Sequence, residues 1–413
     1  MTSSEDLIVT LPPVPEEILT SLSGEPKAWS LQNIGKTLRK MLGPSARTAE
    51  RDFDFESVRF PNLSDPLNQI HLGEAWQQFS VSGSGITVAV IDSGCRGDHE
   101  GFEDENEDSR VVSGISFTGT GNNTSDDVGH GTSVAGVIAS ANDIGVAPGA
   151  KILPLKVFGA TSDRKKTLER VVKALEWIVE NGKSKGISIV NLSVGNRLNY
   201  ENTSGFPADL AIIARAMETV IQDLRDIQIP VIVASGNFFK RHKSEVGMSF
   251  PGILPNVISV GAVHSSKDES GESYPGYDGA QIIEADKDII APFTQRLPKN
   301  NNVPFFTTLV APGAPVKSSW HTGSTHYAPK IRGTSIAAPM VTGVIALMQE
   351  RNIKKFGVLP SCAEIESWLE LGATSVHDMQ GAHDNVDNTD KDFPRLDALG
   401  ALQAMDDRTG AGT

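Results

Sequence analysis

Short runs of β-branched and aliphatic residues alternate with longer helical patterns along most of the chain from Ile86 onward. The runs that predict strands are Ile86–Ile91, Lys151–Val157, Ile187–Leu192, Pro230–Ala234 and Val257–Val260. The helical patterns between them cover Thr132–Ser140, Thr167–Asn181 and Leu210–Arg225. This alternation is typical of a parallel sheet with helices on both faces. We therefore predict an α/β fold with a doubly wound, mostly parallel sheet.

The composition excludes several classes of protein. A chain of 413 residues, 39% of them hydrophobic, can bury a large core. The net charge of −14 argues against a nucleic-acid partner or an anionic membrane surface, both of which require basic patches. No apolar run approaches the roughly 20 residues that span a bilayer. The segment Met1–Leu7 lacks the basic flank and apolar stretch of a secretory signal, so we expect a cytoplasmic protein with Cys95 and Cys362 as free thiols.

The chain divides into three parts by the character of its sequence. Residues 1–65 include the proline-rich Leu11–Pro15 and form an N-terminal extension, residues 66–405 form the α/β domain, and residues 406–413 form a C-terminal tail. Inside the domain, residues 264–306 interrupt the alternation with many Gly, Ser, Asp and Asn residues. We predict that they form an extended surface loop insertion.

Three polar residues stand where strands and helices meet. Asp92 follows the first predicted strand, His130 opens an apolar helix in Gly-His-Gly-Thr, and Ser335 begins another in Gly-Thr-Ser-Ile-Ala-Ala-Pro. A serine hydroxyl becomes a nucleophile when an imidazole accepts its proton and a carboxylate orients the imidazole. Taken singly, each residue has an ordinary structural interpretation: Asp92 as a strand-end cap, His130 as a buried histidine and Ser335 as a helix cap. Taken together, they predict a catalytic triad of Asp92, His130 and Ser335.

A fourth residue, Asn237, follows the predicted strand Pro230–Ala234. The carboxyl ends of parallel strands meet at one edge of a sheet, so Asn237 and Asp92 are expected near the same cleft. Attack on an amide carbonyl creates an oxyanion, which preorganised donors stabilise. Asn237 is the predicted side-chain donor, and the backbone N–H of Ser335 at its helix start is the second.

The motifs around these residues occur together in one order, namely Val-Ile-Asp-Ser-Gly (90–94), Gly-His-Gly-Thr (129–132), Ala-Ser-Gly-Asn (234–237) and Gly-Thr-Ser-Ile-Ala-Ala-Pro (333–339). This set resembles the motifs of the subtilisin-like serine proteases, and the resemblance covers roughly residues 65 to 405. It implies a subtilisin-like peptidase domain over 66–405. It further implies a serine endopeptidase that hydrolyses peptide bonds through an acyl-enzyme on Ser335.

The resemblance also implies how a peptide or protein substrate binds. The substrate would lie as an extended strand beside Ser193, Val194 and Gly195, with backbone pairing for affinity and side-chain pockets for specificity. The other wall of the primary pocket would be formed by Ala234, Ser235 and Gly236.

Calcium is where the chain departs from the family. Many relatives hold a tight calcium ion with a carboxylate shortly after the catalytic aspartate and a loop before Gly-Val-Ala-Pro. Here the carboxylate position is Gly101 and the loop is shortened to Ala141–Ile144, which leaves too few hard oxygen ligands. We expect that this site is missing and that no cofactor is required. Two acidic runs, Glu100–Asp108 and Asp384–Asp392, are alternative places for weaker calcium binding, although solvated acidic loops are commoner.

Two questions stay open at this point. An alternative to the protease is a catalytically silent module that binds peptides along the same edge. Residues 1–65 are either an inhibitory propeptide, acting as an intramolecular inhibitor as the family often has, or a docking segment that is never removed.

Overall fold

The computed structural model describes residues 63–104, 106–119, 121–162, 166–299, 309–381 and 383–407. Residues 1–62 of the predicted N-terminal extension, 1–65, and residues 408–413 of the predicted tail, 406–413, therefore lie outside the described residues. The structure describes most of the α/β domain.

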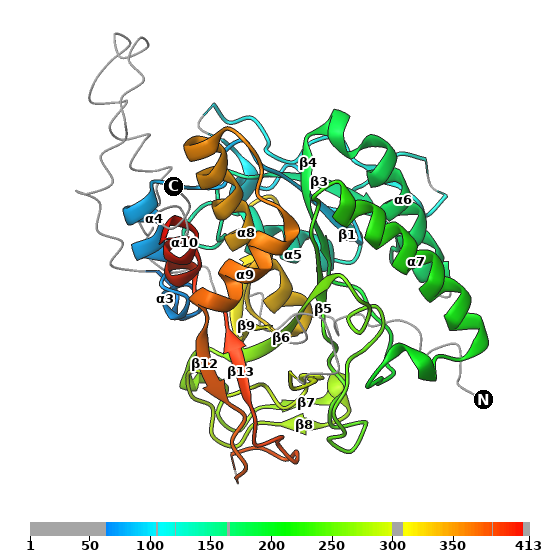
Figure 1. The fold of residues 1–413 in the computed structure, drawn as a ribbon, viewed down its shortest axis with the longest axis vertical. Helices are drawn as coiled ribbons and strands as arrows, with labels where there is room; N and C mark the ends of the chain where they lie inside the picture. Colours follow the sequence, from blue (N-terminus) through cyan, green and yellow to red (C-terminus); the bar gives the residue numbers. More distant parts are fainter. Residues whose placement is uncertain are drawn as a thin grey trace.

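The described residues form a central sheet of nine strands in the order β12-β13-β9-β6-β5-β4-β1-β3-β2 (Figure 1). Its strands are β1 (Thr87–Asp92), β2 (Ile115–Ser116), β3 (Lys151–Lys156), β4 (Ile187–Leu192), β5 (Val231–Ala234), β6 (Val257–His264), β9 (Leu309–Ala314), β12 (Thr374–His377) and β13 (Asp392–Arg395). Neighbouring strands are parallel except β12 and β13, which form an antiparallel hairpin. The prediction of a mostly parallel sheet is confirmed.

Helices cover both faces of the sheet. They are α3 (Asp65–Gln69), α4 (Leu72–Phe79), α5 (His130–Ala139), α6 (Thr167–Lys185), α7 (Ala208–Asp226), α8 (Thr334–Phe356), α9 (Cys362–Gly372) and α10 (Ala398–Asp407). Figure 1 shows α6 and α7 on one side of the sheet and α8, α9 and α10 on the other. No helix among the described residues is long and apolar enough to cross a membrane.

Alternate residues of each central strand enter two separate cores. In β1, Val88 and Val90 pack in the core that contains α5 and α8, whereas Ala89 and Ile91 pack in the core that contains α6 and α7. This follows from the period of two along a strand. A strand that is buried on both faces shows a continuous apolar run, and the residues of β1 are all buried.

The segment predicted as a surface loop is exposed at many positions of residues 266–287, but residues 290–297 are all buried, so the prediction was wrong for that stretch. The described part, residues 264–299, contains the short antiparallel pair β7 (Ser273–Tyr274) and β8 (Ala280–Gln281). The ring of Phe293 packs 5.3 Å from that of Tyr274 and 4.8 Å from that of Tyr277. A few irregularly spaced aromatic residues anchor this polar segment to the core, although they produce no periodic pattern in the sequence.

Candidate active site

Asp92 and His130 form a buried pair at the carboxyl edge of the sheet. Asp92 is the last residue of β1, and His130 is the first residue of α5. The imidazole Nδ1 lies 2.8 Å from Asp92 Oδ1 and 2.9 Å from Oδ2. Oδ1 also accepts the backbone N–H of Ser93 at 2.7 Å, which fixes the carboxylate. Since Nδ1–H donates to Asp92, the other ring nitrogen, Nε2, is left to accept a proton.

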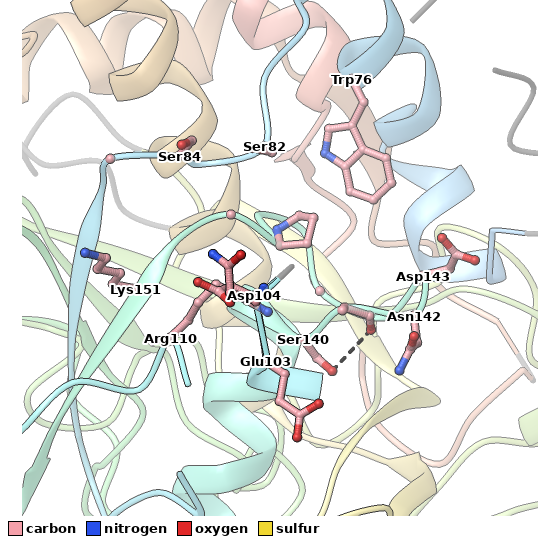
Figure 2. A pocket seen from close by; sticks show the side chains of 16 residues that line it. Trp76, Ser82, Ser84, Glu103, Asp104, Arg110, Ser140, Asn142, Asp143 and Lys151 are labelled. Atoms are coloured by element: carbon pink, nitrogen blue, oxygen red, sulfur yellow. Dashed lines mark hydrogen bonds between the residues drawn. The ribbon is translucent and has the colours of Figure 1, made fainter. Parts of the chain in front are cut away.

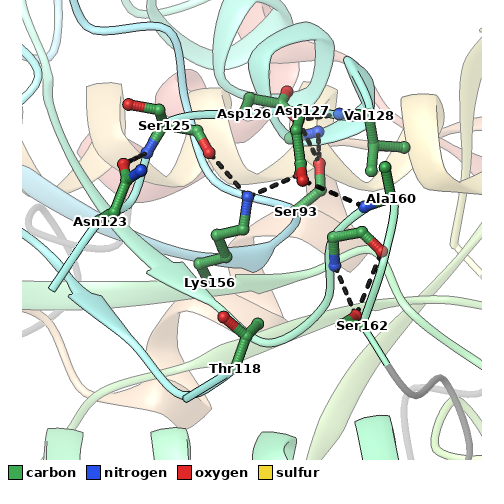
Figure 3. Close-up of polar contacts among 12 residues, drawn as sticks. Ser93, Thr118, Asn123, Ser125, Asp126, Asp127, Val128, Lys156, Ala160 and Ser162 are labelled. Atoms are coloured by element: carbon green, nitrogen blue, oxygen red, sulfur yellow. Dashed lines mark hydrogen bonds and ion pairs between the residues drawn. The ribbon is translucent and has the colours of Figure 1, made fainter. Parts of the chain in front are cut away.

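A second carboxylate, Asp126, holds this pair in place. Its Oδ1 accepts the hydroxyl of Ser93 at 2.8 Å and two backbone N–H groups of the turn before α5. Its Oδ2 accepts the N–H and the hydroxyl of Thr132 at 2.8 and 2.7 Å, while Ser93 Oγ accepts the N–H of Gly131. Figure 3 shows Asp126 beside Ser93 and Val128. Sequence reasoning missed this residue, whose one signal is an acidic side chain at the N-terminus of a helix.

The electrostatics of the pair favour a protonated imidazole. Burial by itself lowers the pKa of His130, but the charge and hydrogen bond of Asp92 and the charge of Asp126 outweigh burial. The pKa of His130 is therefore raised above its ordinary value of 6.5. A histidine with a raised pKa is a stronger base once it has lost its proton.

This shift predicts the pH dependence of activity. A general base must be neutral, so kcat/KM should rise with pH along an acid limb whose midpoint lies above 6.5. Asp126→Asn removes one of the charges that raise the pKa, so the midpoint should move to lower pH. The measurement is kcat/KM for a peptide substrate between about pH 5 and 9 for both proteins. A wild-type midpoint at or below the ordinary value would contradict the prediction.

Ser335 is the second residue of α8, after the N-cap residue Gly333. Its side chain is buried, and its hydroxyl has no hydrogen-bond partner among the described residues, His130 included. Its backbone is held instead, because Ser193 Oγ donates to the carbonyl of Ser335 at 2.9 Å. Ser193 in turn accepts from the Asn191 amide at the end of β4. The start of α8 is thus fixed to the sheet while the hydroxyl stays free.

Asn237 lies in the turn after β5, against the start of α8. Its amide oxygen accepts the backbone N–H of Thr334 at 2.8 Å and the Thr334 hydroxyl at 2.9 Å. The backbone N–H can only donate, so the atom that faces it must be the amide oxygen. This leaves Asn237 Nδ2 as the free donor, as the oxyanion role requires. Thr334, which orients the amide, is a further residue that sequence reasoning missed.

The two predicted substrate segments lie side by side. Ser193, Val194 and Gly195 follow β4, and Ala234, Ser235 and Gly236 end and follow β5, where Leu192 pairs with Val233. Ser249 lies between them. A Cβ atom on Gly195 would lie 3.0 Å from Ser249 Oγ, and one on Gly236 would lie 2.8 Å from Ser249 Cβ. The Ser249 hydroxyl is buried and has no partner among the described residues.

The turn that precedes the serine is tied to the insertion. Arg332 Nη2 lies 2.8 Å from Oε1 of Glu269, a fully buried carboxylate of the insertion. The hydroxyl of Tyr277 donates to the Arg332 carbonyl at 2.9 Å. Both contacts restrain the backbone that leads into α8.

Cys95 does not take part in the chemistry. It follows Asp92 closely in sequence, but it is buried and free. Burial, together with the charges of Asp126, Asp92 and Asp98, raises the pKa of the Cys95 thiol well above its ordinary value. A protonated, buried thiol is not a nucleophile.

The region around Gly101 and the short loop, where relatives hold calcium, is occupied by protein groups. A Cβ atom on Gly101 would lie 2.2 Å from Ser140 Oγ, so a carboxylate side chain has no room there. The guanidinium of Arg110 donates to three carbonyls in this region, those of Ala139 at 2.7 Å, Ala150 at 3.1 Å and Gly101 at 2.8 Å. Burial lowers the pKa of Arg110 to about 10, so it stays charged at neutral pH. A protein cation thus links these carbonyls.

The cavity and the acidic run near this loop are two other candidate places for metal ligands among the described residues. Beside the short loop lies a cavity of about 560 Å³, whose lining includes Trp76, Arg110, Ser140 and Asn142 but none of the triad residues (Figure 2). Among the residues that the structure describes, no group of three or more His, Cys, Asp or Glu side chains is placed to hold a metal. In the acidic run Glu100–Asp108, Asp104 Oδ1 accepts two backbone N–H groups of its own turn. Weaker calcium binding at the acidic runs stays a prediction.

Arg110→Ala should lower the free energy of unfolding by about 3 kcal/mol, because three buried carbonyls lose a charged donor. A calcium chelator should leave the unfolding midpoint of the wild type unchanged. Urea denaturation with and without chelator measures both effects. Arg215→Ala, at an exposed position on α7, is the control and should change little. A wild type that loses comparable stability in chelator would contradict the assignment.

A hydroxyl at the start of a helix, an imidazole held by a buried carboxylate and an amide donor beside the hydroxyl are the working parts of a serine hydrolase. Here they lie at the carboxyl edge of a parallel α/β sheet.

Comparisons with known proteins give the family. The model of the subtilase family matches residues 83–392, so the chain belongs to the subtilases and is a serine endopeptidase. It is 29% identical over 300 residues to subtilisin BL of Lederbergia lenta, which covers 72% of this chain and 86% of that protein. It is 28% identical over 303 residues to the major intracellular serine protease of Bacillus subtilis, covering 71% and 77%. It is 30% identical over 267 residues to the cuticle-degrading serine protease of Arthrobotrys oligospora, covering 65% and 52%.

Proposed function

We propose that Ser335 is the nucleophile of this endopeptidase, with His130 as general base, Asp92 as its orienting acid and Asn237 as oxyanion donor. The observation that carries the proposal is the buried Ser335 hydroxyl without a partner, together with a His130–Asp92 pair that leaves Nε2 free. His130 Nε2 takes the hydroxyl proton as Ser335 Oγ bonds to the substrate carbonyl carbon. The carbonyl oxygen gains the negative charge and accepts hydrogen bonds from Asn237 Nδ2 and the Ser335 N–H.

The same residues complete the reaction. His130 gives its proton to the leaving amine as the C–N bond breaks, which leaves the acyl group on Ser335. A water molecule then loses a proton to His130 and attacks the acyl carbon. The C–O bond to Ser335 breaks, and the serine recovers its proton from His130.

We propose that the substrate peptide lies extended along Ser193–Gly195, with the side chain before the cleaved bond between Gly195 and Gly236. Three observations support this. Both segments end neighbouring parallel strands, Ser193 contacts the backbone of Ser335, and Gly236 donates its N–H to Thr334 beside the nucleophile. The side chain of Ser249 would lie at the end of such a pocket.

Covalent labelling tests the assignment. A fluorophosphonate probe should label the wild type on the peptide that contains Ser335, as mapped by mass spectrometry, and should not label Ser335→Ala. Equal labelling of the two proteins would contradict the proposal. A wild type that binds peptides but is neither labelled nor active would favour the silent peptide-binding module.

For residues 1–65 we propose intramolecular inhibition, supported by the need to restrain a peptidase before it meets its substrate. Labelling of the full chain and of a chain without residues 1–65 tests this. Faster labelling of the shortened chain supports inhibition. An unchanged rate and folding yield would instead indicate a docking segment.

A further inference from the structure

One stretch of the insertion, Phe293–Arg296, pairs with the turn that carries Asn237. The N–H of Gln295 donates to the Gly236 carbonyl at 2.9 Å, and the N–H of Phe239 donates to the Phe293 carbonyl at 3.1 Å. The hydroxyl of Ser235 donates to the Gln295 carbonyl at 2.6 Å. The turn therefore has an external backbone support on both sides of Asn237.

The side chain of Gln295 extends this support to a second loop. It is fully buried. Its Oε1 accepts the backbone N–H of Phe238, the residue after Asn237, at 3.3 Å. Its Nε2 donates to the Leu198 carbonyl at 2.9 Å and to Asn199 Oδ1 at 2.8 Å, both in the loop that follows the predicted substrate edge. One amide thus bridges the loops after β4 and β5.

Gly236 and Gln295 also fit each other sterically. Gly236 has a φ of +114°, and a Cβ atom there would lie 2.2 Å from Gln295 Oε1. The absence of a side chain at Gly236 lets the glutamine amide approach the turn closely. The glycine before the oxyanion asparagine and the insertion glutamine therefore depend on each other.

The next residue anchors the stretch to the body of the protein. The Arg296 guanidinium is fully buried, and its Nε lies 3.0 Å from Asp378 Oδ2. The central carbon of the guanidinium lies 3.9 Å from the centroid of the Phe239 ring. The backbone carbonyl of Arg296 accepts the N–H of Gly247 at 2.9 Å. Since breaking a buried ion pair is strongly unfavourable, Gln295 is held on a rigid base.

We propose that Gln295 is a positioning residue for the oxyanion hole, which sets the place of the Asn237 amide. Thr334 holds the Asn237 amide directly, through hydrogen bonds to its oxygen. Gln295 holds the backbone on both sides of Asn237, at Gly236 and at Phe238. The oxyanion forms in a small region, and a misplaced donor loses much of its effect on the rate. The proposal rests on the proposed role of Asn237, and Gln295 itself does not touch substrate.

The test compares Gln295→Met, which keeps the length of the side chain but removes its polar atoms, with the wild type. We expect kcat for a peptide substrate to fall about tenfold, less than the 10²- to 10³-fold loss known for removing the equivalent donor in subtilisin. KM should change less than kcat. In an Asn237→Ala background the same substitution should have no further effect on kcat, because the donor it positions is gone.

Two further variants complete the design. Gln69→Met is the matched control, since Gln69 is also buried and its Nε2 bonds His264 O and Asp288, not the 235–238 turn, so kcat should stay within twofold. Ser235→Ala removes the hydroxyl that bonds the Gln295 carbonyl and should lower kcat severalfold. In the Asn237→Ala background, Ser235→Ala should not lower kcat further. If Gln295→Met does not fold, Ser235→Ala tests the positioning role of Gln295 in its place.

Each outcome has a distinct meaning. An active wild type with unchanged kcat in folded Gln295→Met and in Ser235→Ala would overturn the positioning role. A fall that persists equally in the Asn237→Ala background would overturn it as well, since the effect would not pass through Asn237. If the wild type hydrolyses no peptide, the proposed function is wrong, and this result is distinguishable from a loss of kcat that appears only in the Gln295 and Ser235 variants.

Discussion

Replacing Ser335 by alanine should lower kcat for peptide hydrolysis by about 10⁶-fold, a magnitude carried over from subtilisin. Alanine removes the oxygen atom that would form the acyl bond. The change deletes a hydroxyl without a partner among the described residues, so it should cost almost no stability. Initial rates with a fluorogenic peptide and thermal unfolding of the same preparations measure both quantities.

The matched control is Ser318→Ala. Ser318 is also fully buried, and its hydroxyl donates to the Ser133 carbonyl at 2.7 Å, not to a residue of the proposed triad. That variant should lose some stability and keep its kcat, the reverse of the effect at Ser335. If Ser335→Ala retains more than about a hundredth of the activity, another residue must be the nucleophile.

Replacing Asp92 by asparagine should lower kcat by about 10⁴-fold. The amide NH₂ of asparagine would donate to His130 Nδ1, which moves the ring proton to Nε2. Nε2 could then no longer accept the proton of Ser335. The same change removes the largest influence that raises the pKa of His130, so any residual activity should show an acid limb at lower pH. Steady-state rates across pH measure both effects.

An exposed carboxylate provides the control for this prediction. Asp98→Asn, at a side chain that is 70% exposed, should leave kcat within twofold. An Asp92→Asn protein that folds and keeps wild-type kcat would show that the His130 tautomer does not limit the reaction.

Strands and helices with a regular apolar period could be predicted from the sequence. β4 coincides with its prediction, and β1, β3 and β5 begin or end within a residue of theirs, because each is rich in β-branched and aliphatic residues. β9 was not predicted, since Pro312 and Gly313 interrupt its pattern. The C-terminal hairpin β12–β13 was missed for a similar reason, as its strands are short and largely polar.

Some residues of the candidate site could be identified from local sequence motifs, and others could not. Asp92, His130, Asn237 and Ser335 stand in distinctive local motifs, so the sequence alone identified them as candidates. Asp126 contacts Ser93, Thr334 contacts Asn237, and Gln295 contacts Leu198 and Phe238, all far away in the chain, so the sequence did not indicate these partners. Gln295 in particular lies in a segment whose composition suggested a loop.

The ion pair between Arg296 and Asp378 has a consequence for the growing polypeptide. Asp378 and its neighbour Asn388, which also bonds the Arg296 guanidinium, are synthesised after all of the triad residues. A ribosome-bound or truncated chain that ends before them would leave the Arg296 guanidinium without these two partners. This support of the turn that carries Asn237 therefore forms only after nearly the whole domain has been made.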